Sequence, residues 1–366
     1  MSKKTKTLKW ILILILIIGG TTLIYKNKTA SKVSVNQWDN IYNEDNLIFF
    51  YGDNNDEKIK VLNELYNIGK EVSGESDSLK KAIKVSEVLE NIIAFDDVSN
   101  SKSINGFDII KEKNGLKKAS ARDVAIIYRD FLQSVGLTAR VGEFKKTDAK
   151  DKNQKSYYIV EFWSKSDNKW IMIDFIDHGY LDNQGFPCSA TEILNSDIRN
   201  LNYKGKSDRN EYIQKLKKVL YTYTVAIDNT TNMSKSNSYL TYFKDKKEIS
   251  LIFKGKFLPP TIFTENEELI NKNPMDLTIG SDEKPYIILM KKQQENTAEE
   301  VSKNSFIIGG FKSGSIINKF YLRINSGSFE KMESYTDLYL EDGVNTIEIS
   351  LDGENTLNKI EIEYNK

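Results

Sequence analysis

The chain contains almost no cysteine or histidine. Among its 366 residues there is one of each, Cys188 and His178. A single cysteine cannot form an intramolecular disulfide, and this pair alone cannot supply a zinc site of the usual four-ligand kind. We therefore expect no metal and no cofactor. Catalysis by a Cys–His pair would have to use these two residues.

The chain also has no net charge. Lysine plus arginine and aspartate plus glutamate both number 52. This balance gives no overall attraction to nucleic acid or to an anionic surface, so no nucleic-acid partner is expected. Hydrophobic residues at 39% and charged residues at 28% are ordinary proportions for a folded protein. The length predicts two domains with appendages.

The N-terminus carries the longest apolar run. Residues 1–7 form a basic cytoplasmic tail without acids, and residues 8–25 are mostly apolar. A helix of about 18 residues spans roughly 27 Å, which is enough to cross a bilayer. The basic flank predicts a single-pass signal-anchor in the cell membrane, with the lipid bilayer as a partner, a cytoplasmic N-terminus and an extracellular bulk. The alternative is a cleaved signal peptide, although no small-residue cleavage site follows the run.

Beyond this segment the pattern predicts a stalk over residues 26–45 and two folded domains. Residues 46–205 show helical periodicity followed by strands, whereas residues 206–366 consist mostly of short alternating runs between turn residues. Residues 346–351 and 359–364 alternate apolar and polar side chains, as half-buried strands do. The expected fold class is α+β, with a transmembrane helix, a papain-like domain and a C-terminal antiparallel β-sandwich.

The most informative stretch is a predicted helix over residues 121–135. Ser120 is a good N-cap residue, and Asp123 lies at the third helical position, as in a capping box. Apolar side chains such as Phe131 recur on one face, and Gly136 suits the left-handed position after a helix. We expect a helix that begins at Ala121 and is buried along one side.

Four short motifs follow one another in this region. They are Ala121-Arg-Asp-Val-Ala125, Gly136-Leu-Thr-Ala-Arg140, Tyr157-Tyr-Ile-Val-Glu161 and Trp170-Ile-Met-Ile-Asp174. With a Gly-Phe-Pro-Cys-Ser tail at 185–189, they make residues 75–205 resemble the transglutaminase-like superfamily, whose catalytic domain has a papain-like cysteine-protease fold. In that family the corresponding segments read C-x-D-x-A, then G-x-x-A-R, then H-x-x-x-E, then a Trp before an x-x-D strand.

The resemblance implies that Ala121 and Tyr157 occupy the catalytic cysteine and histidine positions, while Asp174 occupies that of the orienting acid. A cysteine at a helix N-terminus is activated by the positive end of the helix dipole and by a neighbouring histidine. Alanine has no nucleophile, and tyrosine, with a reference pKa of about 10, is a poor base at neutral pH. The resemblance therefore implies a degenerate member without an active triad.

This pattern favours a catalytically inactive domain that binds or scaffolds a cell-envelope peptide, protein or glycan. The alternative is a cysteine-type hydrolase, a protease or amidase, with a relocated nucleophile at Cys188 or Ser120 and with His178 as base. Each substitute also has a structural interpretation: Ser120 as a helix cap, His178 in a surface loop, and Cys188 as a small buried apolar residue. A third hypothesis makes the chain an assembly module.

Overall fold

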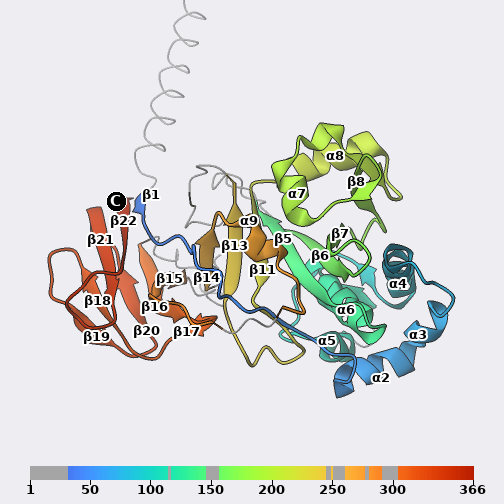
Figure 1. The fold of residues 1–366 in the computed structure, drawn as a ribbon, viewed down its shortest axis with the longest axis horizontal. Coiled ribbons are helices and arrows are strands. Elements are labelled where there is room, and N and C mark those ends of the chain that lie inside the picture. Colours follow the sequence, from blue (N-terminus) through green and yellow to red (C-terminus); the bar gives the residue numbers. More distant parts are fainter. Residues whose placement is uncertain are drawn as a thin grey trace, which may run out of the picture.

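The computed structural model describes residues 32–113, 117–145, 156–244, 249, 260–276, 280–290 and 304–366. Figure 1 shows a β-sandwich beside a larger α/β unit. The described residues are α+β, with eight α-helices among them.

A six-stranded sheet forms the centre of the α/β unit. Its neighbouring strands are antiparallel, except that β13 and β14 run parallel. The strand order is β14 (Thr261–Thr264), β13 (Tyr239–Phe243), β11 (Thr222–Ala226), β5 (Ala139–Lys145), β6 (Tyr157–Ser164), β7 (Lys169–Ile173). Three small sheets lie around it: β10 (Asn202–Lys204) with β8 (Tyr180–Asn183) and β9 (Phe186–Pro187), β12 (Asp228–Asn229) with β2 (Phe50–Tyr51), and β3 (Ala94–Phe95) with β4 (Lys118–Ala119).

Alternate side chains of the six-stranded sheet point into two different cores. Val160 and Phe162 of β6 belong to a core with helix α6, whereas Ile159 between them belongs to a core with helix α8. We call these sides the α6 face and the α8 face. The α6 face is covered by α2 (Glu57–Tyr66), α3 (Ile68–Glu71), α4 (Ser78–Ile92), α5 (Gly106–Glu112) and α6 (Ala121–Ser134). The α8 face is covered by α7 (Ala190–Asn195), the 3₁₀ turn Ile198–Asn200, α8 (Arg209–Lys217) and α9 (Glu267–Asn271).

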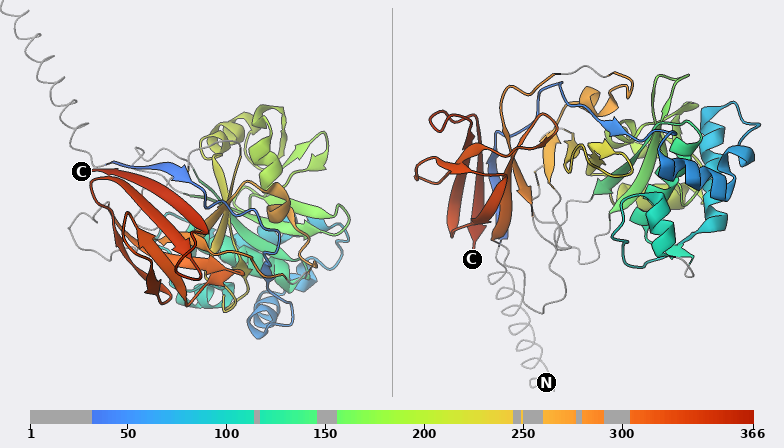
Figure 2. Two further views of the ribbon diagram at one scale, coloured as in Figure 1. Left: turned by 60° about the vertical axis from the view of Figure 1, so that its left-hand side comes forward. Right: turned by 90° about the horizontal axis from the view of Figure 1, so that it is seen from below.

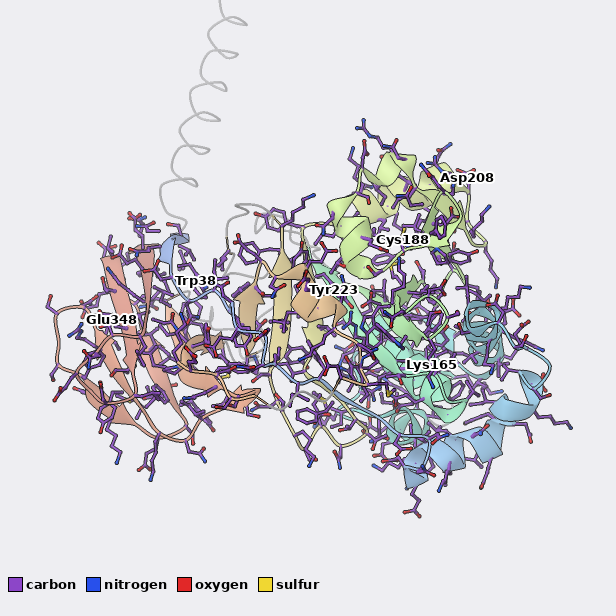
Figure 3. The ribbon with its side chains drawn as sticks, viewed as in Figure 1. Trp38, Lys165, Cys188, Asp208, Tyr223 and Glu348 are labelled. Atoms are coloured by element: carbon purple, nitrogen blue, oxygen red, sulfur yellow. The ribbon has the colours of Figure 1, made fainter. Side chains whose placement is uncertain are left out.

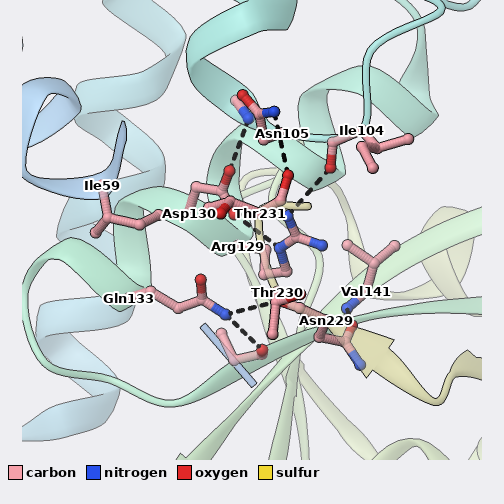
Figure 4. Close-up of polar contacts among 12 residues, drawn as sticks. Ile59, Ile104, Asn105, Arg129, Asp130, Gln133, Val141, Asn229, Thr230 and Thr231 are labelled. Atoms are coloured by element: carbon pink, nitrogen blue, oxygen red, sulfur yellow. Dashed lines mark hydrogen bonds and ion pairs between the residues drawn. The ribbon is translucent and has the colours of Figure 1, made fainter. Parts of the chain in front are cut away.

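Helix α6 begins and ends as the sequence predicts. The Ser120 side chain accepts a hydrogen bond from the Asp123 amide, and Gly136 follows the helix with φ of +81°. The helix is buried on more than its apolar side, which differs from the expectation. Arg129 pairs with its neighbour Asp130 at 2.7 Å, and Gln133 donates to the carbonyls of residues 139 and 229 (Figure 4). The carbonyl of Asn229 and the backbone at the start of α5 contact this polar side, which periodicity cannot reveal.

Two antiparallel sheets form the β-sandwich. The first has the order β1 (Lys32–Trp38), β22 (Asn358–Asn365), β21 (Gly343–Ser350), β18 (Phe320–Ile324), β19 (Glu330–Met332). The second joins β15 (Tyr286–Met290), β16 (Ser305–Lys312), β17 (Ser315–Ile316) and β20 (Tyr335–Tyr339). Their facing side chains, among them Ile308 and Ile360, make the sandwich core.

The sandwich draws on both ends of the chain, unlike the expected arrangement. Residues 32–38, placed by the sequence in a stalk, form β1 and pair with β22, as Figure 2 shows for the blue strand beside the red sheet. Strands β11, β13 and β14 follow residue 205, the expected boundary, yet they continue the six-stranded sheet. An alternating pattern predicts that a strand exists, but it does not say which sheet the strand joins.

The expected fold class is corrected at its N-terminal element. The predicted transmembrane helix, residues 8–25, and the basic tail before it lie outside the described residues. Within residues 32–366, apart from the gaps given above, no helix has the length and apolar character needed to cross a bilayer. The expected single-pass membrane localisation is corrected with it, and what the described residues support is an α+β fold.

Candidate functional site

Tyr157 and Asp174 meet beside the sheet. Tyr157 is the first residue of β6 and Asp174 follows β7 directly, so two neighbouring strands bring them together. The Tyr157 hydroxyl donates a hydrogen bond to the Asp174 carboxylate. The second carboxylate oxygen accepts from the amides of Ile176 at 3.1 Å and Asp177 at 3.2 Å. Both oxygens of the buried carboxylate therefore accept hydrogen bonds, one from a phenol and the other from two backbone amides of the following turn.

Two further tyrosines, Tyr203 and Tyr212, complete this cluster, and no sequence motif points to them. The rings of Tyr203 and Tyr212 stack with centroids 3.6 Å apart. Lys215 of α8 holds its ammonium 5.2 Å from the Tyr157 ring centroid. Burial, followed by the negative charge of Asp174, raises the pKa of Tyr157 well above its usual value. Tyr157 is therefore a neutral hydrogen-bond donor near pH 7 and cannot act as a base there.

Ala121 lies across the sheet from this pair. It begins α6, whereas Tyr157 packs against the core on the α8 face. The neighbouring residue Tyr158 packs on the α6 face and lies near enough for the Arg122 charge to act on its pKa. A step of one residue along a strand reverses the side-chain direction. The structure therefore joins two of the three expected positions and separates the third from them by the sheet.

Two motif charges, Arg140 and Glu161, form a fully buried ion pair on the α8 face. The Arg140 Nη2 atom lies 2.6 Å from Glu161 Oε2, and Arg140 Nη1 donates to the carbonyl of Ile270 at 2.7 Å. Glu161 also accepts from the Tyr223 hydroxyl at 2.6 Å and from the Ala190 amide at 2.8 Å. The pair links β5, β6, β11, α7 and α9, so these motif residues hold the fold together.

Cys188 is a buried thiol between β9 and α7 (Figure 3). Its exposed fraction is 3%, and burial raises its pKa to about 11. The Sγ atom lies 3.8 Å from the carbonyl oxygen of Phe186. Little thiolate exists at neutral pH under these conditions. The interpretation of Cys188 as a small buried apolar residue is confirmed.

His178 is buried, and the expectation of a surface loop position is wrong. Its Nδ1 lies 2.7 Å from Ser86 Oγ and its Nε2 lies 3.1 Å from Glu90 Oε2. Ser86 and Glu90 stand one turn apart on α4, so the imidazole fastens the turn after β7 to that helix. The i, i+4 spacing of the two polar residues was a signal for a shared partner. The sequence could not say which residue that partner is.

Ser120 serves as the N-cap of α6, as the structural interpretation predicted. Its Oγ accepts from the Asp123 amide at 3.2 Å. The Asp123 carboxylate in turn accepts from the Ser101 amide at 2.7 Å and pairs with Arg122 at 3.0 Å. The hydroxyl is engaged in holding the helix start.

No group of three or more His, Cys, Asp or Glu side chains among the described residues is arranged to hold a metal ion. The two acids beside Tyr157 already accept hydrogen bonds from the protein. Asp174 accepts those described above, and Asp177 accepts from Tyr203 and from Ser207. The local chemistry is that of buried hydroxyl–carboxylate hydrogen bonds.

Comparisons with known proteins find matches among solved structures. The chain matches no protein-family model and no curated protein sequence. Among solved structures it is similar to a protein from Cytophaga hutchinsonii that is provisionally named a cysteine protease, with 15% sequence identity and a TM-score of 0.28. The match covers 48% of this chain and 58% of that one. A TM-score this low does not establish a shared fold, and it carries no statement about activity.

Proposed function

We propose that the α/β unit is a catalytically inactive, transglutaminase-like domain that binds or scaffolds an extended peptide or glycan. The observation that carries the proposal is the start of α6: Ala121 stands there without a thiol, and Tyr158 of β6, which packs on the same α6 face, supplies no imidazole. With Ala121 at the helix start, the three positions hold neither a thiol nor an imidazole. A covalent mechanism of the cysteine-protease kind needs both.

The relocated-nucleophile alternative receives no support from the contacts of its members. Cys188 bonds weakly to the backbone, while His178 is held by Ser86 and Glu90 on α4. The Ser120 hydroxyl caps α6. A nucleophile and its base must come within hydrogen-bond reach of each other, and each of these side chains is committed elsewhere.

Restoring the missing groups tests the geometry behind the proposal. Ala121→Cys is introduced in a Cys188→Ser background, so that one thiol remains. It is then combined with Tyr158→His or, separately, with Tyr157→His. The pKa of the new thiol is measured from the pH dependence of iodoacetamide alkylation.

We expect Tyr158→His to lower the thiol pKa by more than Tyr157→His does, because Tyr158 is on the α6 face. A histidine near a thiolate favours the charged form. The reverse order would mean that Tyr157, not Tyr158, faces Ala121, and the separation of the expected triad would be refuted.

The binding part of the proposal is tested directly with the full chain. A library of soluble peptidoglycan fragments and of extended peptides is titrated against the wild-type protein, and bound ligands are re-tested for cleavage. We expect saturable binding with the ligand recovered intact. Cleaved ligand would contradict the inactive domain, and no saturable binding to either class would contradict the binding role.

A further inference from the structure

Strand β20 presents a row of exposed aromatic and acidic side chains. Tyr335 and Tyr339 are 58% and 64% exposed, and Asp337 between them is also exposed. Two further exposed acids, Glu333 and Glu341, flank the strand. Large aromatic rings are normally covered, so two on one short strand indicate an interaction surface.

One edge of β20 is open within the part of the chain that the structure describes, because β20 pairs there with β16 alone. The amide of Leu340 donates to the carbonyl of Asn304, so the ladder bonds to β16 come from the even-numbered residues. Backbone groups alternate in direction along an antiparallel strand. The N–H and C=O groups of Asp337 and Tyr339 therefore point to the open edge, where an added strand can bond to them.

Among the residues that the structure describes, the acids of this row lack the cationic partners found elsewhere in the sandwich. Glu348 pairs with Arg323 at 2.7 Å, and Glu361 pairs with Lys359 at 2.7 Å. No described lysine or arginine forms an ion pair with the acids of the β20 row, Glu333, Asp337 and Glu341. Cationic side chains are attracted both to carboxylates and to the faces of tyrosine rings.

We propose that β20 is a docking edge for an extended, lysine- or arginine-rich peptide segment of a partner protein. The segment adds to the sandwich as a strand and places cationic side chains over Tyr335 and Tyr339 and beside Asp337. A neutral glycan would use the rings but would leave the carboxylates and the open backbone edge unused. This surface is on the sandwich and does not depend on what the α/β unit does.

The test uses three labelled peptides and the full chain, with binding followed by fluorescence anisotropy. The first peptide has four Thr-Lys repeats and can add as a basic strand. The second has four Thr-Glu repeats. The third has four Pro-Lys repeats, which keep the charge but lack half of the backbone N–H donors and favour a polyproline helix over a β-strand. Soluble chitin and peptidoglycan oligosaccharides serve as the glycan probes.

We expect saturable binding of the Thr-Lys peptide alone, at least about 10-fold tighter than either peptide control. The double variant Tyr335→Ser/Tyr339→Ser is expected to weaken it about 10-fold, since each tyrosine loses a cross-strand contact and a cation–π contact. Asp337→Asn should weaken it a few-fold, and Asp337→Pro should weaken it more, because proline also removes an outward N–H.

Matched controls are Phe186→Ser, which removes an aromatic side chain that is 72% exposed on the α/β unit, and Glu64→Gln, which removes an exposed acid on α2. Both should leave the Kd unchanged, and circular dichroism checks that every variant is folded. Equal binding of the Pro-Lys peptide would refute strand addition. Unchanged affinity in the double variant would refute the site, and binding of oligosaccharide in place of the Thr-Lys peptide would refute the class of partner.

Discussion

Replacing Glu161 by glutamine removes one negative charge from the buried centre of the α/β unit and changes little else in shape. Arg140 and Glu161 are both fully buried, and the arginine also lies 4.0 Å above the Trp170 ring. Burial is the largest single influence on Arg140 and would lower its pKa, but Glu161, Tyr223 and Tyr51 together outweigh it and hold the pKa above its usual value. In Glu161→Gln the guanidinium stays charged and loses its counter-ion.

Breaking a buried ion pair by removing one partner costs about 3–5 kcal/mol. A loss within this range is expected for Glu161→Gln, because Tyr223 and Ala190 donate to different oxygens of the carboxylate and the single amide oxygen can accept from only one of them. Asp197→Asn is the matched control: its pair with Arg199 has side chains that are 41% and 72% exposed. Exposed pairs of this kind are screened by water and contribute little to stability.

The free energy of unfolding is measured for both variants by urea titration at neutral pH. A loss for Glu161→Gln that does not exceed the loss for Asp197→Asn would refute the buried pair. The double replacement Arg140→Met/Glu161→Met gives a further check, since removing both charges should recover part of the stability that the single variant loses.

Two other predictions concern the site and its surroundings. Tyr157→Phe should lower the unfolding free energy by about 1–3 kcal/mol, because it takes a hydroxyl donor from the buried Asp174 carboxylate; urea titration against Tyr158→Phe checks it, and no loss beyond that control would contradict the bond. The hydrogen bond from Lys206, together with His178, lowers the pKa of Glu90, so its contribution is present above about pH 4.5 and is lost as the pH falls through the lowered folded-state value. The unfolding free energy of wild type should therefore exceed that of Glu90→Gln by at most about 1 kcal/mol near pH 6. Thermal scans should show this difference shrinking below pH 4, and a difference that grew with acidity would contradict the prediction.

The sequence predicted those parts of the fold that local chemistry specifies. The cap at Ser120 and the glycine after the helix determine where α6 begins and ends, and both signals lie within a few residues of what they control. The alternating strands near the C-terminus were likewise predictable. Their location in a sandwich that begins with β1 was not, because the pairing of β1 with β22 joins the two ends of the chain.

The candidate site shows the same division between local and distant information. Motif spacing correctly brought Tyr157 close to Asp174, since neighbouring strands joined by a short turn fix their register. The spacing does not reveal which face of the sheet α6 covers. The prediction therefore placed Ala121 in one site with Tyr157 and Asp174, which lie on the opposite face. The partners of His178, Ser86 and Glu90, could not be predicted either, because α4 lies about ninety residues earlier in the chain.

The most direct test of the central claim is the hydrolytic activity of the full chain compared with that of Cys188→Ser. Casein and a panel of peptide amides are incubated with each protein at neutral pH, and a thiol-directed peptidyl inhibitor is added in parallel to measure covalent labelling. The inactive domain predicts the same background turnover in both proteins and no labelling of wild type. Turnover that disappears in Cys188→Ser, or stoichiometric labelling of Cys188, would contradict it.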